Sequence, residues 1–127
     1  MSEVITDKLT GRATAGDVTI TSEGGSATMQ LQQGVAKAWN RYQTQNTPSV
    51  ANSFNIASLT DNGTGNITSH FTNNTSNANN PAPAIASSMN TVHQSETTGY
   101  VAIKHYSSTH AASDVSRAMV TVHGDLA

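Results

Sequence analysis

The stretch GYVAIKHY at residues 99–106 carries the clearest strand pattern in this chain of 127 residues. Val101, Ile103 and His105 fall on every second position, and the residues between them are more polar or smaller. Successive side chains of a strand point to opposite faces of a sheet, so this period of two predicts a strand with one face turned inward. The pattern therefore favours an all-β fold.

Other segments show the same alternation. Residues 117–123 place Ala118, Val120 and Val122 on one face. We expect further strands at residues 18–21, 37–42 and 84–90, one strand in which Ile67, Ser69 and Phe71 share a face, and one in which Phe54 and Ile56 do. These make about seven short strands at regular spacing, which is typical of a small antiparallel β-sandwich, either jelly-roll or immunoglobulin-like.

The chain is expected to divide near residue 34. Residues 35–127 hold most of the strand patterns and form the predicted β-sandwich domain. Residues 1–34 combine one predicted strand with glycine-rich breaks and few core candidates, so we interpret them as an extended N-terminal docking arm. Within residues 27–36 we expect at most a short helix or turn, because Gly34 interrupts the helical pattern.

Two segments are predicted to be connections between strands. The sequence DNGTG at residues 61–65 predicts a hairpin turn with positive φ at Asn62 and Gly63, since Asn and Gly tolerate that conformation. Residues 72–83 are rich in Asn and contain Pro81 and Pro83, which predicts a long exposed loop. Such a loop is either a solvated connection or a recognition surface.

Composition narrows the classes of function. Ser, Thr and Asn supply 45 residues, charged residues make up only 11%, and the net charge is −2. Without a basic surplus, nucleic acid is not an expected partner. No apolar run is long enough to span a bilayer, and the first residues do not resemble a secretory signal, so we expect synthesis in a cytoplasm and no membrane partner.

No known catalytic arrangement is found in the sequence. It has no cysteine, no paired carboxylates at a useful spacing, and no nucleophile, zinc or phosphate-loop motif, so we expect no enzymatic activity, no metal and no cofactor. Five histidines leave one alternative open. One inward His per chain around a threefold axis, such as His105 or His123, would build a metal site, whereas the simpler reading is ordinary hydrogen bonding.

Aromatic and amide side chains are the candidate binding residues. Trp39 is either a stacking platform for sugar rings or the single core tryptophan of the sandwich. The candidates for binding a glycan or a partner are Trp39, Arg41, Tyr42, Asn73, Asn74, Asn77, Asn79, Tyr100 and Tyr106.

Three segments resemble small structural proteins of tailed bacteriophages. LQQGVAKAW at residues 31–39 is similar to their LQQGLAKAW stretch, and ASLTDNGTGNITSHF at residues 57–71 is similar to their SSITDNGTGxYTVxF hairpin. The ending VTVHGDLA at residues 120–127 also resembles theirs, with His123 where an aromatic is common. NRYQ at residues 40–43 departs from the more apolar strand of that family.

The resemblance implies a non-enzymatic virion protein made in the bacterial cytoplasm. We expect a tail-fibre module that faces the host surface and contacts a tail adaptor or the capsid. A chain with so few aromatics has a thin core, which favours a homo-oligomer, with a trimer as the preferred form. Two alternatives stay open: a capsid decoration (cement) protein, and a carbohydrate-binding module that recognises a host surface glycan.

Overall fold

The computed structural model separates the chain into two compact units, residues 1–35 and residues 36–127. The residues that the structure describes are 4–10, 12, 18–21, 25, 27–79 and 81–125. The predicted arm therefore lies partly outside the described residues.

The first unit contains a two-stranded sheet and one helical turn. Strand β1 (Thr19–Thr21) pairs antiparallel with β2 (Thr28–Gln30), and helix α1 (Leu31–Gly34) follows directly. Every residue of both strands is exposed. The short helix agrees with the expectation for residues 27–36, although β2 was not predicted.

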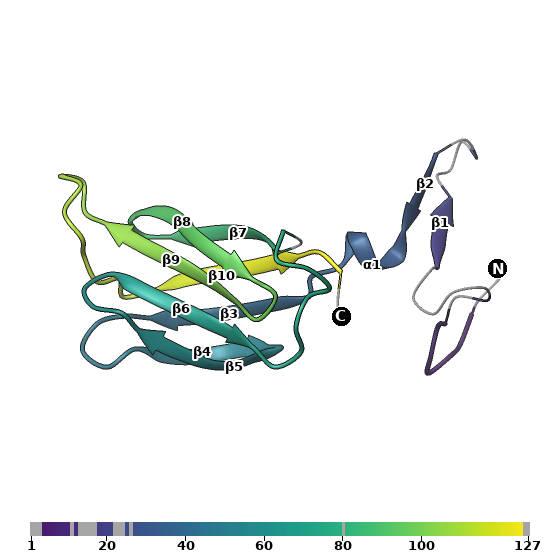
Figure 1. Ribbon diagram of the computed structural model, residues 1–127, viewed down its shortest axis with the longest axis horizontal. Coiled ribbons are helices and arrows are strands. Elements are labelled where there is room, and N and C mark those ends of the chain that lie inside the picture. The colour runs from purple at the N-terminus through teal and green to yellow at the C-terminus, as the bar shows by residue number, and fades with distance from the viewer. Residues whose placement is uncertain are drawn as a thin grey trace. The chain divides into compact units, whose positions relative to one another are not determined.

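The second unit is a sandwich of two four-stranded antiparallel sheets, as the sequence predicts (Figure 1). One sheet has the order β4-β3-β10-β7 and the other the order β5-β6-β9-β8. Its first strand β3 and its last strand β10 are therefore neighbours. The bounds are β3 (Ala38–Gln43), β4 (Ser49–Phe54), β5 (Ile56–Asp61), β6 (Asn66–Phe71), β7 (Ala82–Ser87), β8 (Asn90–Thr97), β9 (Tyr100–Tyr106) and β10 (Ala118–His123).

The core lies between the two sheets and follows the predicted alternation. The inward faces of β9, β6 and β10 are all buried, which confirms the three faces expected from sequence. On β3 the buried residues are Ala38, Asn40 and Tyr42, and Trp39 and Arg41 point to the outer face. Asn40 Nδ2 donates a hydrogen bond to Ser69 Oγ at 3.1 Å, which links the two sheets through the core.

A single residue separates β4 from β5. Asn55 has a φ of 56°, which ends β4 and sends the chain into the opposite sheet. The expectation that Phe54 and Ile56 share a face of one strand is therefore wrong. Phe54 ends β4 with 54% of its surface exposed, and Ile56 begins β5 and packs against the core.

The β5–β6 hairpin forms where predicted but with another geometry. The positive φ values belong to Gly63 (103°) and Gly65 (65°), and Asn62 does not have one. The loop is longer than a two-residue turn, because β5 ends at Asp61 and β6 begins at Asn66. Asp61 Oδ1 accepts a hydrogen bond from Gly63 N at 2.9 Å, which stabilises this wider loop.

The Asn-rich loop is shorter than expected. β6 ends at Phe71 and β7 already begins at Ala82, so Pro83 lies within a strand. β7 is an edge strand, and an edge tolerates proline because one row of its backbone groups has no partner strand. Thr75 anchors the loop: it is 2% exposed, and its backbone N–H donates to Thr98 O at 2.8 Å.

Candidate functional site

The structure does not bring the predicted binding residues together. Trp39 and Arg41 lie on the outer face of the β4-β3-β10-β7 sheet, and Tyr100 and Tyr106 lie on the outer face of the opposite sheet. Asn73, Asn74, Asn77 and Asn79 lie in the loop between β6 and β7. Tyr42 is only 1% exposed, so it belongs to neither surface.

Tyr42 instead forms a buried pair with His105. Its Oη lies 3.0 Å from His105 Nε2, and His105 Nδ1 lies 3.1 Å from Thr91 Oγ1. Burial raises the pKa of Tyr42 above its usual range and lowers the pKa of His105, an effect that the charge of nearby Asp114 partly opposes. Both imidazole nitrogens are engaged and the ring is fully buried, so His105 is not available to a metal site shared between chains.

A groove crosses the outer face of the β5-β6-β9-β8 sheet, and strand register explains why it forms. One row of small side chains runs across all four strands: Thr60 pairs with Thr68, Thr68 with Ala102, and Ala102 with Ser95. These four residues form the floor of a groove of about 360 Å³, which we call the transverse groove.

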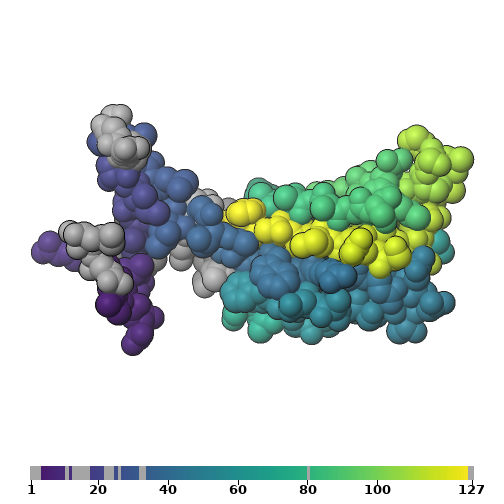
Figure 2. Space-filling view, turned by 180° about the vertical axis from the view of Figure 1, so that it is seen from behind, coloured from purple at the N-terminus to yellow at the C-terminus, as the bar shows by residue number. Residues whose placement is uncertain are grey.

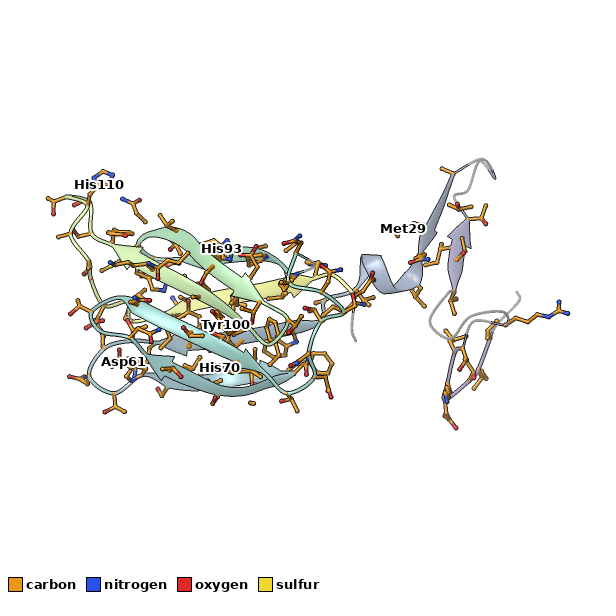
Figure 3. The ribbon with its side chains drawn as sticks, viewed as in Figure 1. Met29, Asp61, His70, His93, Tyr100 and His110 are labelled. Atoms are coloured by element: carbon orange, nitrogen blue, oxygen red, sulfur yellow. The ribbon has the colours of Figure 1, made fainter. Side chains whose placement is uncertain are left out.

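Larger side chains on both sides of that row make the walls. His70 and Tyr100 are cross-strand partners on one side, with ring centroids 5.8 Å apart in an edge-to-face arrangement (Figure 3). Asn62 and Asn66 line the groove from the β5–β6 hairpin. Gln94 also lines it, and it lies at a break in the pairing between His93 and Ser95. Such a β-bulge re-aims a side chain, which is how β8 adds an amide to the groove.

Hydrogen bonds hold the groove side chains in position. Thr60 Oγ1 lies 2.9 Å from His70 Nε2, and Asn62 Nδ2 donates to Thr68 Oγ1 at 2.8 Å. Asn66 Oδ1 is buried and has no hydrogen-bond partner among the described residues. The lining contains no Asp, Glu, Lys or Arg. The groove therefore presents amides, hydroxyls, one imidazole and one phenol ring.

The outer face of the other sheet carries larger apolar side chains, among them the exposed Phe54 and Met119. In Figure 2, β10 (yellow) runs between β3 and β4 (blue) and β7 (green). Register places Phe54 beside Trp39, and it places the exposed Met119 beside Arg41. Trp39 is partly buried on this outer face, so it is not part of the core cluster between the sheets.

The described part of the chain shows no group of three or more metal-ligating side chains. Among the same residues, no helix is long and apolar enough to cross a membrane. Comparison of the chain with protein-family models, with curated proteins and with solved structures gives no match.

Proposed function

We propose that this chain is a non-enzymatic structural subunit of a tailed bacteriophage virion, a fibre module that assembles with copies of itself on the tail. Two kinds of observation support the proposal. One is the resemblance in the segments at residues 31–39, 57–71 and 120–127. The other is the contrast between a sandwich that has its own core and an N-terminal unit whose described residues are nearly all exposed.

The exposed apolar side chains of the N-terminal unit carry the proposal. Among the described residues of this unit, six large apolar ones are exposed, including Val4 at 83% and Ile5 at 87%; the others are Leu9, Ile20, Met29 and Val35. Burial of apolar surface contributes a stabilising free energy of about 25 cal/mol for each Å² removed from water. A two-stranded sheet without a buried face is at best marginally stable. This unit therefore gains most of its stability on contact with another subunit.

The apolar outer face of the β4-β3-β10-β7 sheet supports the same function. Phe54, Trp39 and Met119 give this face a surface suited to contact between subunits, since aromatic residues and Met are enriched in such interfaces. The low content of charged residues also lets many copies lie close together with little repulsion.

Light scattering on the purified full chain over a concentration series tests the assembly. We expect the mass of an oligomer, a trimer in the preferred form, and a shift toward monomer in an Ile5→Ser/Leu9→Ser variant. Val92→Ser is the matched control, because it also replaces an exposed apolar side chain but lies on the sandwich. A monomer at every concentration, or equal dissociation of the control, contradicts self-assembly through the N-terminal unit.

Antibody labelling of the particle tests the location. Label confined to the tail is the expected result for a fibre module. Even coverage of the head contradicts it and supports a decoration protein instead. Absence of the protein from purified virions contradicts both.

A further inference from the structure

We propose that the transverse groove binds a neutral saccharide, with Tyr100 as the ring against which the sugar packs. The inference goes beyond a structural role in a virion. It rests on the sandwich alone, so it can fail or succeed independently of the assembly proposed above. Of the glycan-binding candidates expected from the sequence, the proposal keeps Tyr100 and leaves out Trp39 and the Asn-rich loop.

The chemistry of the lining selects the class of ligand. An anion would need Lys or Arg for strong charge-assisted hydrogen bonds, and the lining has neither. An apolar ligand would cover the exposed amide of Gln94 without pairing it, which is unfavourable. A saccharide offers hydroxyls that both donate and accept, and its C–H face suits the ring of Tyr100.

The groove is also organised in advance of binding. The Thr60–His70 and Asn62–Thr68 hydrogen bonds orient two lining pairs, which reduces the entropy lost when a ligand binds. Asn66 Oδ1, by contrast, is a buried acceptor with no partner among the described residues. A buried acceptor without a partner is costly, so turning the Asn66 amide into the groove to meet a sugar hydroxyl would be favourable.

The position of Gln94 is an independent indication of a binding site. The break in β8 pairing places this exposed amide at the groove, opposite the side chains that β5 and β6 supply. Bulges of this kind occur next to functional sites. At about 360 Å³ the groove lies near the lower end of the range for small-ligand sites, ~300–1,000 Å³, so it suits a short segment of a glycan.

The test is a titration followed by NMR on the full chain labelled with ¹⁵N. The probes are glucose, galactose, mannose, rhamnose, N-acetylglucosamine and N-acetylgalactosamine, with disaccharides of each, and inorganic phosphate as the anionic arm. We expect at least one sugar to shift the side-chain amide signals of Asn62, Asn66 and Gln94 in a saturable way. The concentrations extend to about 10 mM, which is tenfold above a Kd of ~1 mM.

Two variants and a control assign the effect to the groove. Tyr100→Ala and Gln94→Ala are each expected to weaken binding about tenfold or more. Tyr106→Ala is the control, because Tyr106 is also an outward tyrosine on β9 but does not line the transverse groove. Gln94 is exposed, so its variant remains informative even if Tyr100→Ala does not fold.

Three results would overturn the proposal. The first is that no saccharide shifts the groove signals over the whole range. The second is that sugar shifts appear only elsewhere on the sandwich, or that phosphate alone shifts the groove. The third is that Gln94→Ala and Tyr100→Ala, both folded, bind the sugar as tightly as the unaltered chain.

Discussion

Asp114 Oδ1 accepts a hydrogen bond from the backbone N–H of Gly65 at 2.7 Å. The same oxygen accepts a weaker one from Thr44 Oγ1 at 3.3 Å, and Thr44 Oγ1 in turn accepts from Val115 N at 2.9 Å. One carboxylate thus joins the β5–β6 hairpin, the end of β3 and the segment before β10. The hairpin that carries Asn62 and Asn66 is held through this contact.

Replacing Asp114 with Ala is expected to lower the free energy of unfolding by about 1.5–3 kcal/mol, the range for hydrogen bonds to a charged group. Urea denaturation measures the change. Asp61→Ala is the matched control, because Asp61 also accepts a hydrogen bond from a backbone N–H in this hairpin but is exposed. It should lower the free energy of unfolding by less than half as much. Equal losses for the two variants would argue against the role given to Asp114.

Gly65→Ala is expected to be more destabilising than Gly63→Ala. Both glycines have positive φ, so a Cβ strains the backbone by about 1–2 kcal/mol at either position. At Gly65 that Cβ would also lie 2.5 Å from Ser113 O and 2.7 Å from His105 O, whereas at Gly63 it would meet nothing within 4 Å. Thermal melts of both variants check the order, and a Gly63 variant that melts at the lower temperature contradicts it.

Stability is expected to fall as the pH drops below about 6.5, the ordinary pKa of histidine. Burial lowers the pKa of His105 in the folded state, so below pH 6.5 the unfolded chain binds more protons than the folded chain. The contribution of neutral His105 to the free energy of unfolding is complete above that pH. It is lost at up to ~1.4 kcal/mol per pH unit as the pH falls. Denaturation curves between pH 8 and pH 5 measure it.

The control for this pH effect is His105→Gln, which should flatten the part of the slope that His105 causes. If that variant does not fold, the NMR signal of the His105 ring in the unaltered chain gives the answer. A ring that takes up its proton at pH 6.5 or above in the folded protein contradicts the prediction.

Asn55 supports the corner between the two sheets through its positive φ and through its side-chain hydrogen bonds, and two substitutions separate these roles. Its side-chain Nδ2 donates to Lys37 O and Asn73 O, and its Oδ1 accepts from Asn73 N. Asn55→Gly keeps the positive φ accessible but loses these bonds, at about 0.5–1.5 kcal/mol for each. Asn55→Ala loses the bonds and adds backbone strain of ~1–2 kcal/mol. Urea denaturation should therefore give a lower free energy of unfolding for Asn55→Ala than for Asn55→Gly. The reverse order would contradict this account.

The sequence predicts those strands whose inward faces carry large apolar residues. β6, β9 and β10 alternate cleanly, and all three were expected. β4 and β5 were not separated, because the sequence does not reveal that Asn55 adopts a positive φ. β8 was missed as a strand of its own, since the break at Gln94 interrupts the alternation just where the strand serves the groove.

The candidate site was less predictable than the fold, because it depends on register. Thr60, Thr68, Ala102 and Ser95 are unremarkable one by one and form a floor only when four strands align. Tyr100 was identified as a candidate from its residue type, but its neighbours were not. The amides flanking the turn, Asn62 and Asn66, were the available signal, but Asn62 was interpreted only as a turn former and Asn66 was not singled out.

The pairing of β3 with β10 also determines how the sandwich responds to mechanical load. Ala38 starts β3 beside Val122 near the end of β10, and Lys37 N donates to Val122 O at 2.7 Å. Force applied between Ala38 and Val122 breaks the backbone hydrogen bonds between β3 and β10 one after another. His110 lies in the loop between β9 and β10, at the opposite end of the sandwich from the start of β3 (Figure 3). Force applied between Ala38 and this far loop pulls along the strands and loads many bonds at once. A sandwich held at Ala38 and pulled at that far loop is therefore loaded in its stronger direction.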